Sequence, residues 1–342
     1  MAIPNPIPPY ARTLDAKPND VSIVKPGELV DVVEMTPLTL TDRRIYNILL
    51  ANAWDGILDA KEHAIPKREL QVTLHKGTDR LEDSIKRLMT AIVEVQVVRD
   101  GKKGTKRLSL LGTNTTSDVD DGFFYYDFPS DMRGIIGEST IFARLHRKIM
   151  FALTSKYSLA LYEMVQKRGN LTRSYEEFSI EELRSFMGVP KGKLTSWINF
   201  KNRAITPSVQ EVSALSDFDV SIDPVKGKSK QFTGVRLSWK RKDAPDLQKV
   251  ERELSFSKVG RKARISGTVE QVEAMPASLP RSGPPSLKSD TMGKAKKILP
   301  GYDVYNVEAE WRRWAVGKEP PNNADAAFLA FCKIYRTNNP LT

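Results

Sequence analysis

The sequence is poor in the residues that bind metals or form disulfides. It has one cysteine, Cys332, and three histidines among 342 residues. A single thiol cannot form a disulfide within the chain, which fits a protein of the reducing cytoplasm. His63, His75 and His146 stand far apart, and no cysteine or histidine spacing is typical of a zinc site. We therefore predict a cytoplasmic protein that needs no metal and no cofactor.

The sequence also lacks the motifs of common catalytic sites and of membrane segments. No G-x-x-x-x-G-K-[S/T] run is present to form a phosphate-binding loop. A metal-dependent nickase needs paired histidines beside a nucleophilic tyrosine, and the adjacent Tyr125 and Tyr126 lie in an apolar run without them. No apolar run reaches the ~20 residues of a membrane helix, and the N-terminus lacks the apolar core of a secretion signal. We predict no catalytic residues, no enzymatic activity and no membrane contact.

Positive charge, by contrast, is abundant. The 53 lysines and arginines outnumber the 42 aspartates and glutamates, for a net charge of +11. Such a basic balance favours a polyanionic partner, most often a nucleic acid. The length of the chain suits two domains with additional segments.

Two helices joined by a tight turn are indicated in the second half of the chain. Ser179, with Glu182 three positions later, has the spacing of a capping box, and Gly188 ends that helix. A second helix begins after Thr195 or Ser196, either of which can cap it. Its apolar face comprises Trp197, Phe200, Ala204, Ile205, Val209 and Val212, and its polar face comprises Asn199, Asn202, Arg203, Thr206 and Gln210. This is the layout of a helix-turn-helix, whose second helix enters the DNA major groove.

Two strand-like runs, 218–222 and 232–239, follow this helix, and the loop between them carries Lys226, Lys228 and Lys230. A hairpin with a cationic tip after a helix-turn-helix is the winged-helix arrangement. Its helix can read bases while the wing contacts flanking phosphates. The alternative is an ordinary α/β domain with a solvated basic face.

Several residues around this region form an ordered set. They are Lys156, Tyr157, Leu161, Tyr162, Glu163, Phe200, Lys201, Arg203, Ile205, Pro207 and Glu211. Their order and spacing resemble the second winged-helix domain of iteron-binding plasmid replication initiators. That family has a Lys-Tyr-x₃-Leu-Tyr-Glu helix and a Phe-Lys-x-Arg-x-Ile-x-Pro recognition helix. Two features depart from it, because Trp197 stands where the family has tyrosine and the chain continues well past the second wing.

Residues 37–150 have the pattern of another winged helix. A short helix after Pro66 and a helix capped by Thr78 precede two alternating strands, 93–97 and 107–111. The cations of this helix and wing are Arg80, Arg87, Lys102, Lys103, Lys106 and Arg107. Because acidic residues are interspersed among them, a packing and dimerisation domain is the alternative.

The remaining segments differ in composition. Residues 1–36 are proline-rich and predict an extended N-terminal tail, with 21–24 and 29–33 open to brief pairing as strands. Residues 243–300 are rich in proline, serine and lysine and predict a flexible, disordered linker, with a helix within 246–256 as an open alternative. Residues 301–342 have aromatic residues at helical spacing and predict a small helical module. The predicted fold class is α+β, with two tandem winged-helix domains at 37–150 and 151–242.

The charge and position of side chains predict the DNA contacts. The residues predicted to read bases are Asn199, Asn202, Arg203 and Thr206. Those predicted to contact phosphates are Lys191, Lys193, Lys201, Lys226, Lys228 and Lys230, together with the six cations of the first domain. Lys201 falls on the apolar side of the helix, so we expect it to reach round to a phosphate.

The resemblance implies a plasmid replication initiator that binds repeated origin sequences in double-stranded DNA. It further implies opening of the adjacent duplex, recruitment of host replication proteins such as helicase, and repression of its own gene as a homodimer, which contributes to plasmid copy number control. Two alternatives stay open. One is a winged-helix transcriptional regulator without origin function. The other is a replication nickase or polymerase, which the missing motifs disfavour.

Overall fold

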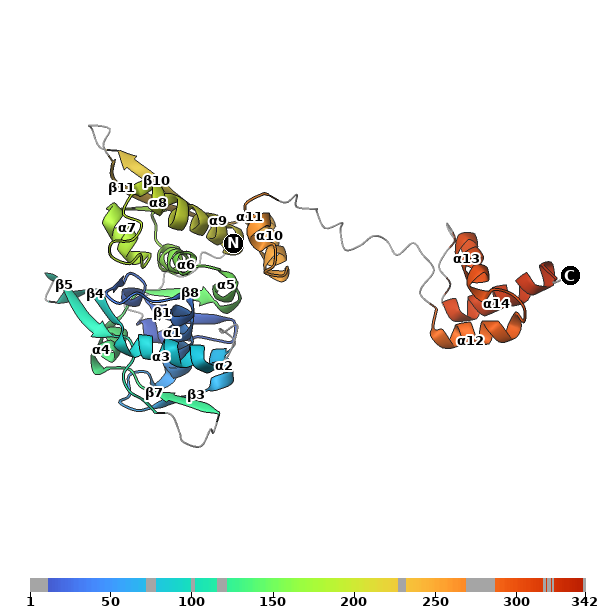
Figure 1. Ribbon diagram of the computed structural model, residues 1–342, viewed down its shortest axis with the longest axis horizontal. Coiled ribbons are helices and arrows are strands. Elements are labelled where there is room, and N and C mark those ends of the chain that lie inside the picture. The colour runs from blue at the N-terminus through green and yellow to red at the C-terminus, as the bar shows by residue number, and fades with distance from the viewer. Residues whose placement is uncertain are drawn as a thin grey trace, which may run out of the picture. The chain divides into compact units, whose positions relative to one another are not determined.

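The computed structural model describes residues 12–71, 78–99, 102–115, 122–226, 232–268, 287–315, 318, 321 and 323–340. The chain divides into two compact units, Met1–Glu270 and Gln271–Thr342. Figure 1 labels the helices and strands of each unit.

The first winged-helix domain begins at α1 (Leu40–Ala53), whose N-terminus is doubly capped. The Thr39 hydroxyl accepts a hydrogen bond from the Asp42 N–H, and the Asp42 carboxylate accepts one from the Thr39 N–H. The residues that face the core recur at helical spacing, as for Ile45, Ile48, Leu49 and Ala53. The cap and the apolar stripe together explain why a helix forms here.

Two further helices and a hairpin complete this domain. They are α2 (Lys67–Gln71), α3 (Thr78–Thr90), β4 (Ile92–Arg99) and β5 (Lys102–Ser109). The two strands pair antiparallel, and alternate residues such as Val93 and Val95 are buried. The order of helix, helix-turn-helix and wing is that predicted from the sequence.

Elements before and after this hairpin enlarge the first domain. β3 (His63–Pro66), β6 (Asn114–Thr115) and β7 (Phe123–Tyr126) form a small antiparallel sheet in the order β3-β7-β6. The hydroxyl of Tyr126 donates to the Leu49 carbonyl at 2.7 Å, which fixes this sheet to α1. The elements that follow are α4 (Ser130–Glu138), β8 (Phe142–His146) and α5 (Arg147–Ala152).

The N-terminal segment differs from the extended tail predicted for residues 1–36. Residues 1–11 lie outside the described part. The remainder is built into the domain, because β1 (Ser22–Pro26) pairs with β8 and β2 (Val33–Glu34) pairs with β4. All five residues of β1 are buried. The prediction is wrong for this stretch because a short apolar strand outweighs the proline content around it.

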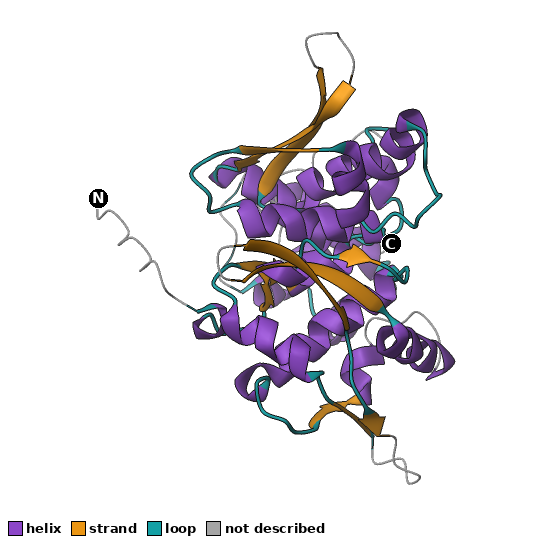
Figure 2. Ribbon diagram, turned by 90° about the vertical axis from the view of Figure 1, so that its left-hand side faces the viewer, coloured by secondary structure: helices purple, strands orange, loops and turns teal. Residues whose placement is uncertain are grey.

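The second winged-helix domain follows the predicted order. Its elements before the recognition helix are α6 (Lys156–Arg168), β9 (Tyr175–Phe178) and α7 (Ile180–Phe186). The recognition helix is continuous and consists of α8 (Trp197–Phe200), a π-helical turn (Lys201–Ile205) and α9 (Thr206–Leu215). Its wing is the hairpin of β10 (Phe218–Lys226) and β11 (Phe232–Arg241), which joins β9 in the order β10-β11-β9. Figure 2 shows this hairpin projecting from the helices.

The two winged helices share one hydrophobic core. Leu49 of α1, Leu161 of α6 and Val212 of α9 belong to the same cluster of buried residues. The helix α6 contacts α1 and β8 on the side of the first domain and α9 on the side of the second (Figure 1). The tandem arrangement of two winged helices is therefore confirmed, and the pair is packed as one body.

The linker predicted for residues 243–300 is wrong at both ends. The side chain of Asp243 caps α10 (Ala244–Ser255), and α10 and α11 (Arg261–Ile265) pack against α9. Leu254 and Ile265 contact the shared core. At the other end, α12 (Ser289–Ile298) belongs to the second unit, and residues 269–286 lie outside the described part. The helix α10 occupies the stretch where the sequence leaves a helix as an open alternative, but its packing against α9 depends on contacts between distant segments, which the local composition does not indicate.

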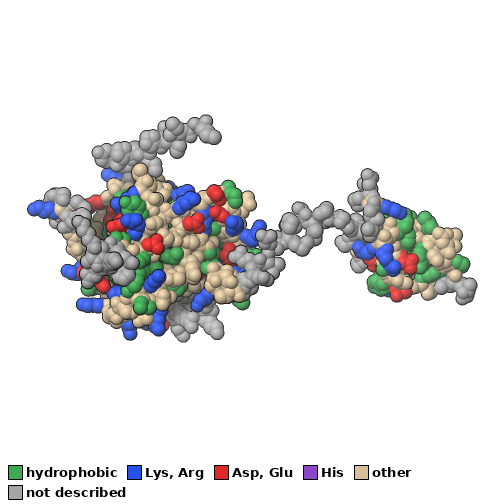
Figure 3. Space-filling view, turned by 90° about the horizontal axis from the view of Figure 1, so that it is seen from above, with side chains coloured by type: hydrophobic (Ala, Val, Ile, Leu, Met, Phe, Trp, Pro, Cys, Tyr) green, Lys and Arg blue, Asp and Glu red, His purple; other side chains and the backbone are tan. Residues whose placement is uncertain are grey.

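The second unit is a bundle of three helices, α12, α13 (Val304–Ala315) and α14 (Ala324–Asn338). Trp311 and Phe328 lie at its centre, with ring centroids 5.3 Å apart. Trp314 is 56% exposed, and Figure 3 shows hydrophobic side chains across the surface of this unit. Among the described helices, none combines the length and the apolar character that crossing a bilayer requires.

Candidate nucleic-acid interface

The recognition helix of the second domain presents its polar face to solvent. Ser196 is its cap, because the Oγ atom accepts a hydrogen bond from the Asn199 N–H at 3.2 Å. The side chains that anchor the helix are Phe200, Ala204, Ile205, Val212 and Leu215, all of which are buried. The residues predicted to read bases, Asn199, Asn202, Arg203 and Thr206, are all exposed.

Arg203 is available for a ligand. Within the part of the chain that the structure describes, its guanidinium forms no hydrogen bond and no ion pair. The acidic residues on either side of it in the sequence bind elsewhere. Glu182 closes the capping box of α7 with Ser179, and Glu211 accepts a hydrogen bond from the Thr154 N–H at 2.8 Å.

The π-helical turn explains why Lys201 is exposed. A regular helical wheel places Lys201 on the apolar side, between Ala204 and Val212. The i→i+5 turn over Lys201–Ile205 is wider than an α-helical turn, so it shifts the phase of the residues that precede α9. Lys201 is thereby moved to the edge of the buried face and reaches solvent. The exposure of Lys201 is compatible with the phosphate contact predicted for it, which stays a prediction.

The turn before the recognition helix carries two exposed lysines, Lys191 and Lys193. At Gly188 the backbone has a φ of +70°, and a Cβ there would lie 2.6 Å from a guanidinium nitrogen of Arg43. Arg184 fixes the far side of the turn, because its guanidinium donates to the Thr195 carbonyl at 3.0 Å and lies 5.0 Å from the Phe200 ring centroid. The lysines are thus held next to the start of the recognition helix.

The wing of the second domain is a long, regular hairpin. Its two strands pair antiparallel, from Phe218 opposite Arg241 to Lys226 opposite Phe232. The register shifts between Val225 and Lys226. At Gly234 a Cβ would lie 2.5 Å from the Phe178 carbonyl oxygen, so glycine permits the close approach of β9. Of the three lysines predicted at the tip, Lys228 and Lys230 lie outside the described residues, as does the side chain of Lys226.

The cations predicted for the first domain are mostly engaged with carboxylates. Arg87 donates two hydrogen bonds to the buried Asp42, both at 2.9 Å. Lys106 pairs with Asp131, and Arg107 pairs with Glu94, each at 2.7 Å. Lys102 is exposed, whereas the side chains of Arg80 and Lys103 are outside the described part. In the view of Figure 3 the basic side chains of the first unit are spread out and interspersed with acidic ones.

Comparisons with known proteins match this organisation. A family model described as initiator replication protein, WH1, matches residues 22–166, and one described as initiator Rep protein, WH2, matches residues 179–239. The chain belongs to the family of iteron-binding Rep initiators. No curated protein matches it. Among solved structures, one of domains 2 and 3 of RctB is similar over 66% of this chain and 94% of that chain, with 11% identity and a TM-score of 0.35.

The residues of α6 that resemble the Rep initiator pattern lie within the WH1 match and bind this helix to other segments of that match. Lys25 of β1 lies 2.9 Å from Glu163, and Lys156 donates to the Leu38 carbonyl at 3.0 Å. The hydroxyl of Tyr162 accepts a hydrogen bond from the His146 N–H at 3.0 Å. Burial lowers the pKa of Lys25, against the opposing effect of the Glu163 charge. Sequence reasoning missed this role, because the partners of Lys156 and Glu163 come from segments more than a hundred positions away.

A second ionic contact of α6 lies at the end of the helix. Asp31 accepts two hydrogen bonds from Arg168, at 2.9 and 2.8 Å, and one from Lys167 at 2.7 Å. Burial by itself would raise the pKa of Asp31, but these two cations hold it below its ordinary value. Buried charges therefore fix α6 to the N-terminal part of the first unit at both ends of the helix, in addition to the shared core.

Sequence reasoning also missed Ile198, the second residue of the recognition helix. It is 69% exposed and belongs neither to the core nor to the side chains packed against it. On a regular helical wheel Ile198 lies between Ile205 and Val209, on the apolar side, so the sequence pattern predicts burial rather than the exposure that the structure has.

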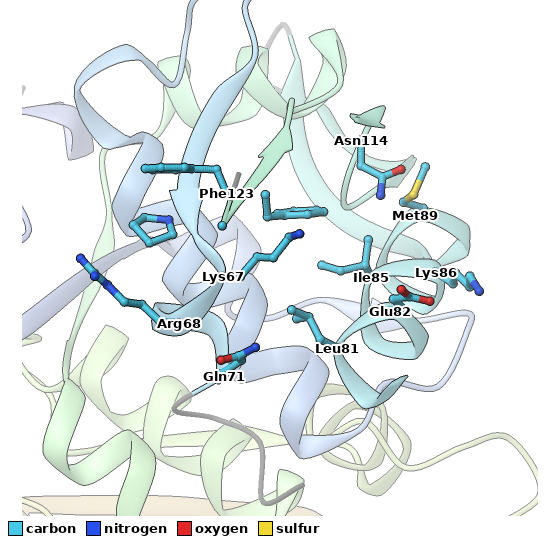
Figure 4. Close-up of a pocket in the computed structure, with 13 residues that line it drawn as sticks. Lys67, Arg68, Gln71, Leu81, Glu82, Ile85, Lys86, Met89, Asn114 and Phe123 are labelled. Carbon is cyan, nitrogen blue, oxygen red and sulfur yellow. The ribbon is translucent and has the colours of Figure 1, made fainter. Parts of the chain in front are cut away.

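The first domain of this Rep initiator also contains a cleft of about 780 Å³. It lies between α2, α3 and β7, and its lining includes Leu81, Ile85 and Phe123 with Lys67 and Arg68. Figure 4 shows Lys67 reaching between the strand of Phe123 and the helix that carries Leu81 and Ile85. Among the described residues, no group of three His, Cys, Asp or Glu side chains is placed to hold a metal ion.

Proposed function

We propose that this Rep initiator binds repeated sequences in double-stranded origin DNA through its second winged helix. The observation that carries the proposal is the recognition helix itself, capped by Ser196, with its polar residues exposed and Arg203 unpaired among the described residues. Asparagine and arginine side chains in a major groove can each form two hydrogen bonds with a base edge, to adenine and guanine respectively. Asn199, Asn202, Arg203 and Thr206 are accordingly the base-reading residues.

Phosphate contacts are assigned to lysines around this helix. They are Lys191, Lys193 and Lys201 on the turn and helix, and Lys226, Lys228 and Lys230 on the wing. In the first domain Lys102 is the clearest candidate, because it is exposed and no carboxylate pairs with it among the described residues. Lys106 and Arg107 could release their carboxylate partners and bind phosphates instead, because exposed ion pairs contribute little to the stability of the fold. Arg87 would leave Asp42 buried without its partner, so we assign it a structural role.

The remaining steps follow from the family. After binding, the initiator opens the adjacent duplex and recruits host replication proteins such as helicase, and as a homodimer it represses its own gene. Footprinting of the full-length protein on the DNA that flanks its gene tests the first step. We expect protection of several copies of one short sequence, and resistance of this protection to an excess of unrelated DNA. Protection that unrelated DNA removes as readily as specific DNA would contradict the proposal.

Two experiments separate the alternatives. A transcriptional regulator is dispensable for replication, so a plasmid that carries the origin would be maintained after deletion of the gene. We expect it to be lost. A nickase or polymerase would relax supercoiled origin DNA or incorporate nucleotides when metal ions and deoxynucleotides are supplied. We expect neither activity from the purified protein.

A further inference from the structure

The exposed isoleucine of the recognition helix occupies the position where bases are read. Ile198 is the second residue of α8, directly after the Ser196 cap and Trp197. Asn202 and Thr206 follow it at intervals of four residues, and all three are exposed. The π-helical turn Lys201–Ile205 interrupts regular α-helical spacing here, so it is their exposure that places the three on the outward side of the helix. Ile198 therefore shares the outward side with the two predicted base-reading residues.

Ile198 is 69% exposed and is not among the buried or partly buried side chains of the hydrophobic core. Its neighbours Leu194 and Trp197 pack against the core, but Ile198 does not. A single exposed hydrophobic residue is common on protein surfaces. Ile198 differs from such residues in its position. Its exposed neighbours on the outward side are polar, and the N-terminal part of this helix is the part that reaches base edges in helix-turn-helix proteins.

Thymine has an apolar group in the major groove, its C5 methyl, and an apolar side chain recognises it by contact. Isoleucine suits such a contact because β-branching restricts its χ1 rotation in a helix, so that little freedom is lost on binding. We propose that Ile198 reads a thymine in each DNA repeat by packing against its C5 methyl. The inference rests on the proposed function, since it requires that α8 enters the major groove.

Single replacements of thymine by deoxyuridine test the proposal, because they remove the methyl and leave the pairing edge intact. Each thymine of one footprinted repeat is replaced in turn, and the affinity of the full-length protein is measured. For the wild type we expect one or two positions per repeat at which uracil weakens binding about fourfold, the effect of withdrawing one methyl group from an apolar contact. The Ile198→Ala variant should bind the natural repeat more weakly and should not distinguish thymine from uracil at those positions.

Two matched variants make the test specific. Ile334→Ala removes an equally exposed isoleucine from the second unit and should leave the response to uracil unchanged. Thr206→Ser removes the methyl group of a predicted base-reading residue on the same side, and it tests whether Thr206, rather than Ile198, contacts the thymine methyl. A thermal melt verifies that each variant is folded.

Three results overturn the inference. If the wild type distinguishes the repeat from unrelated DNA but tolerates every uracil, the thymine contact is absent. The same holds if Ile198→Ala retains the full response to uracil, or if Thr206→Ser alone abolishes it. If the wild type does not distinguish the repeat from unrelated DNA, the proposed function fails together with this inference.

Discussion

Lys25 and Glu163 form a buried ion pair, with 2.9 Å between Nζ and Oε2, although they stand 138 positions apart in the chain. Glu163 Oε1 also accepts a hydrogen bond from the Asn47 side chain at 2.8 Å. The pair connects β1 with α6, and both residues lie within the WH1 match. Removing one partner of a buried pair leaves the other charge uncompensated, and this costs far more than the pair itself contributes.

The Glu163→Ala variant is therefore expected to lose about 3–5 kcal/mol of unfolding free energy. Urea unfolding and thermal melting measure the loss. Glu177→Ala is the matched control, because Glu177 pairs with Arg236 at the surface and its loss should cost about 0–1 kcal/mol. Equal destabilisation by both variants would show that the buried pair does not hold α6 against β1.

Arg87 offers a test between a structural role and a DNA-binding role. Arg87→Ala leaves the buried Asp42 without its two guanidinium hydrogen bonds, so we expect a loss of about 1–3 kcal/mol in stability. The slope of log affinity against log salt should not change. Replacement of Lys226, Lys228 and Lys230 by alanine is the comparison, since each lysine that neutralises a phosphate contributes about 0.9 to that slope. A flattened slope for Arg87→Ala would restore the phosphate-binding role predicted from the sequence.

Asp42 should make stability depend on pH. Burial by itself raises its pKa, but hydrogen bonds from Arg87, Thr39 and Ser84 outweigh burial and hold the pKa below its ordinary value. The carboxylate thus stabilises the fold above the unfolded-state pKa of about 3.9, and this contribution is lost as pH falls through the folded-state pKa. Urea unfolding of the wild type and Asp42→Asn between about pH 2 and pH 7 should show curves that converge in acid. If the difference in unfolding free energy between the two proteins were the same at every pH, the titration of Asp42 would not contribute to stability.

Arg203→Ala should weaken specific binding by about 1–3 kcal/mol and relax the preference at one base position. The reason is that its guanidinium is exposed on the reading face and has no competing partner among the described residues. A binding-site selection with purified variants measures the preference. Arg252→Ala, at an exposed position of α10, should bind like the wild type. An unchanged base preference for Arg203→Ala would remove this residue from the interface.

Truncation at two positions separates the roles of the C-terminal segments. Cutting after Lys242 removes the buried Val250 and the contacts of Leu254 and Ile265 with the shared core, so it should lower the melting temperature of the winged helices. Cutting after Thr268 preserves this packing and should leave melting and single-site affinity unchanged. We expect the second truncation to support replication poorly in a transformation assay, because we expect the exposed Trp314 of the second unit to contact a partner. Unimpaired replication would exclude that role.

Local patterns allowed much of the second domain to be predicted. The Ser179 and Glu182 capping box, the turn at Gly188 and the apolar stripe of the recognition helix are short-range signals, and the structure has each of them. The exposed base-reading set was predictable for the same reason, since burial on one helical face implies exposure on the other.

Long-range partners were not predictable. The strand β1 is short and lies among prolines, so its pairing with β8 depends on a segment about 120 positions away. The helix α10 buries Val250 within a mostly charged sequence. No residue type in the sequence indicates the π-helical turn at Lys201–Ile205. This turn changes which side chains share a face of the helix.

The π-helical turn also limits how the specificity of this initiator can change during evolution. Side chains such as Ile198 and Arg203 point outward, so substitution can alter the DNA sequence that is recognised while the anchor residues stay in place. Insertion or deletion of one residue within the turn would rotate Phe200 by about 100° relative to Leu215 and expose one of these anchors. Relatives of this protein can therefore acquire new origins by exchanging residues on the outer face of the helix, but the length of the helix between its anchors is fixed.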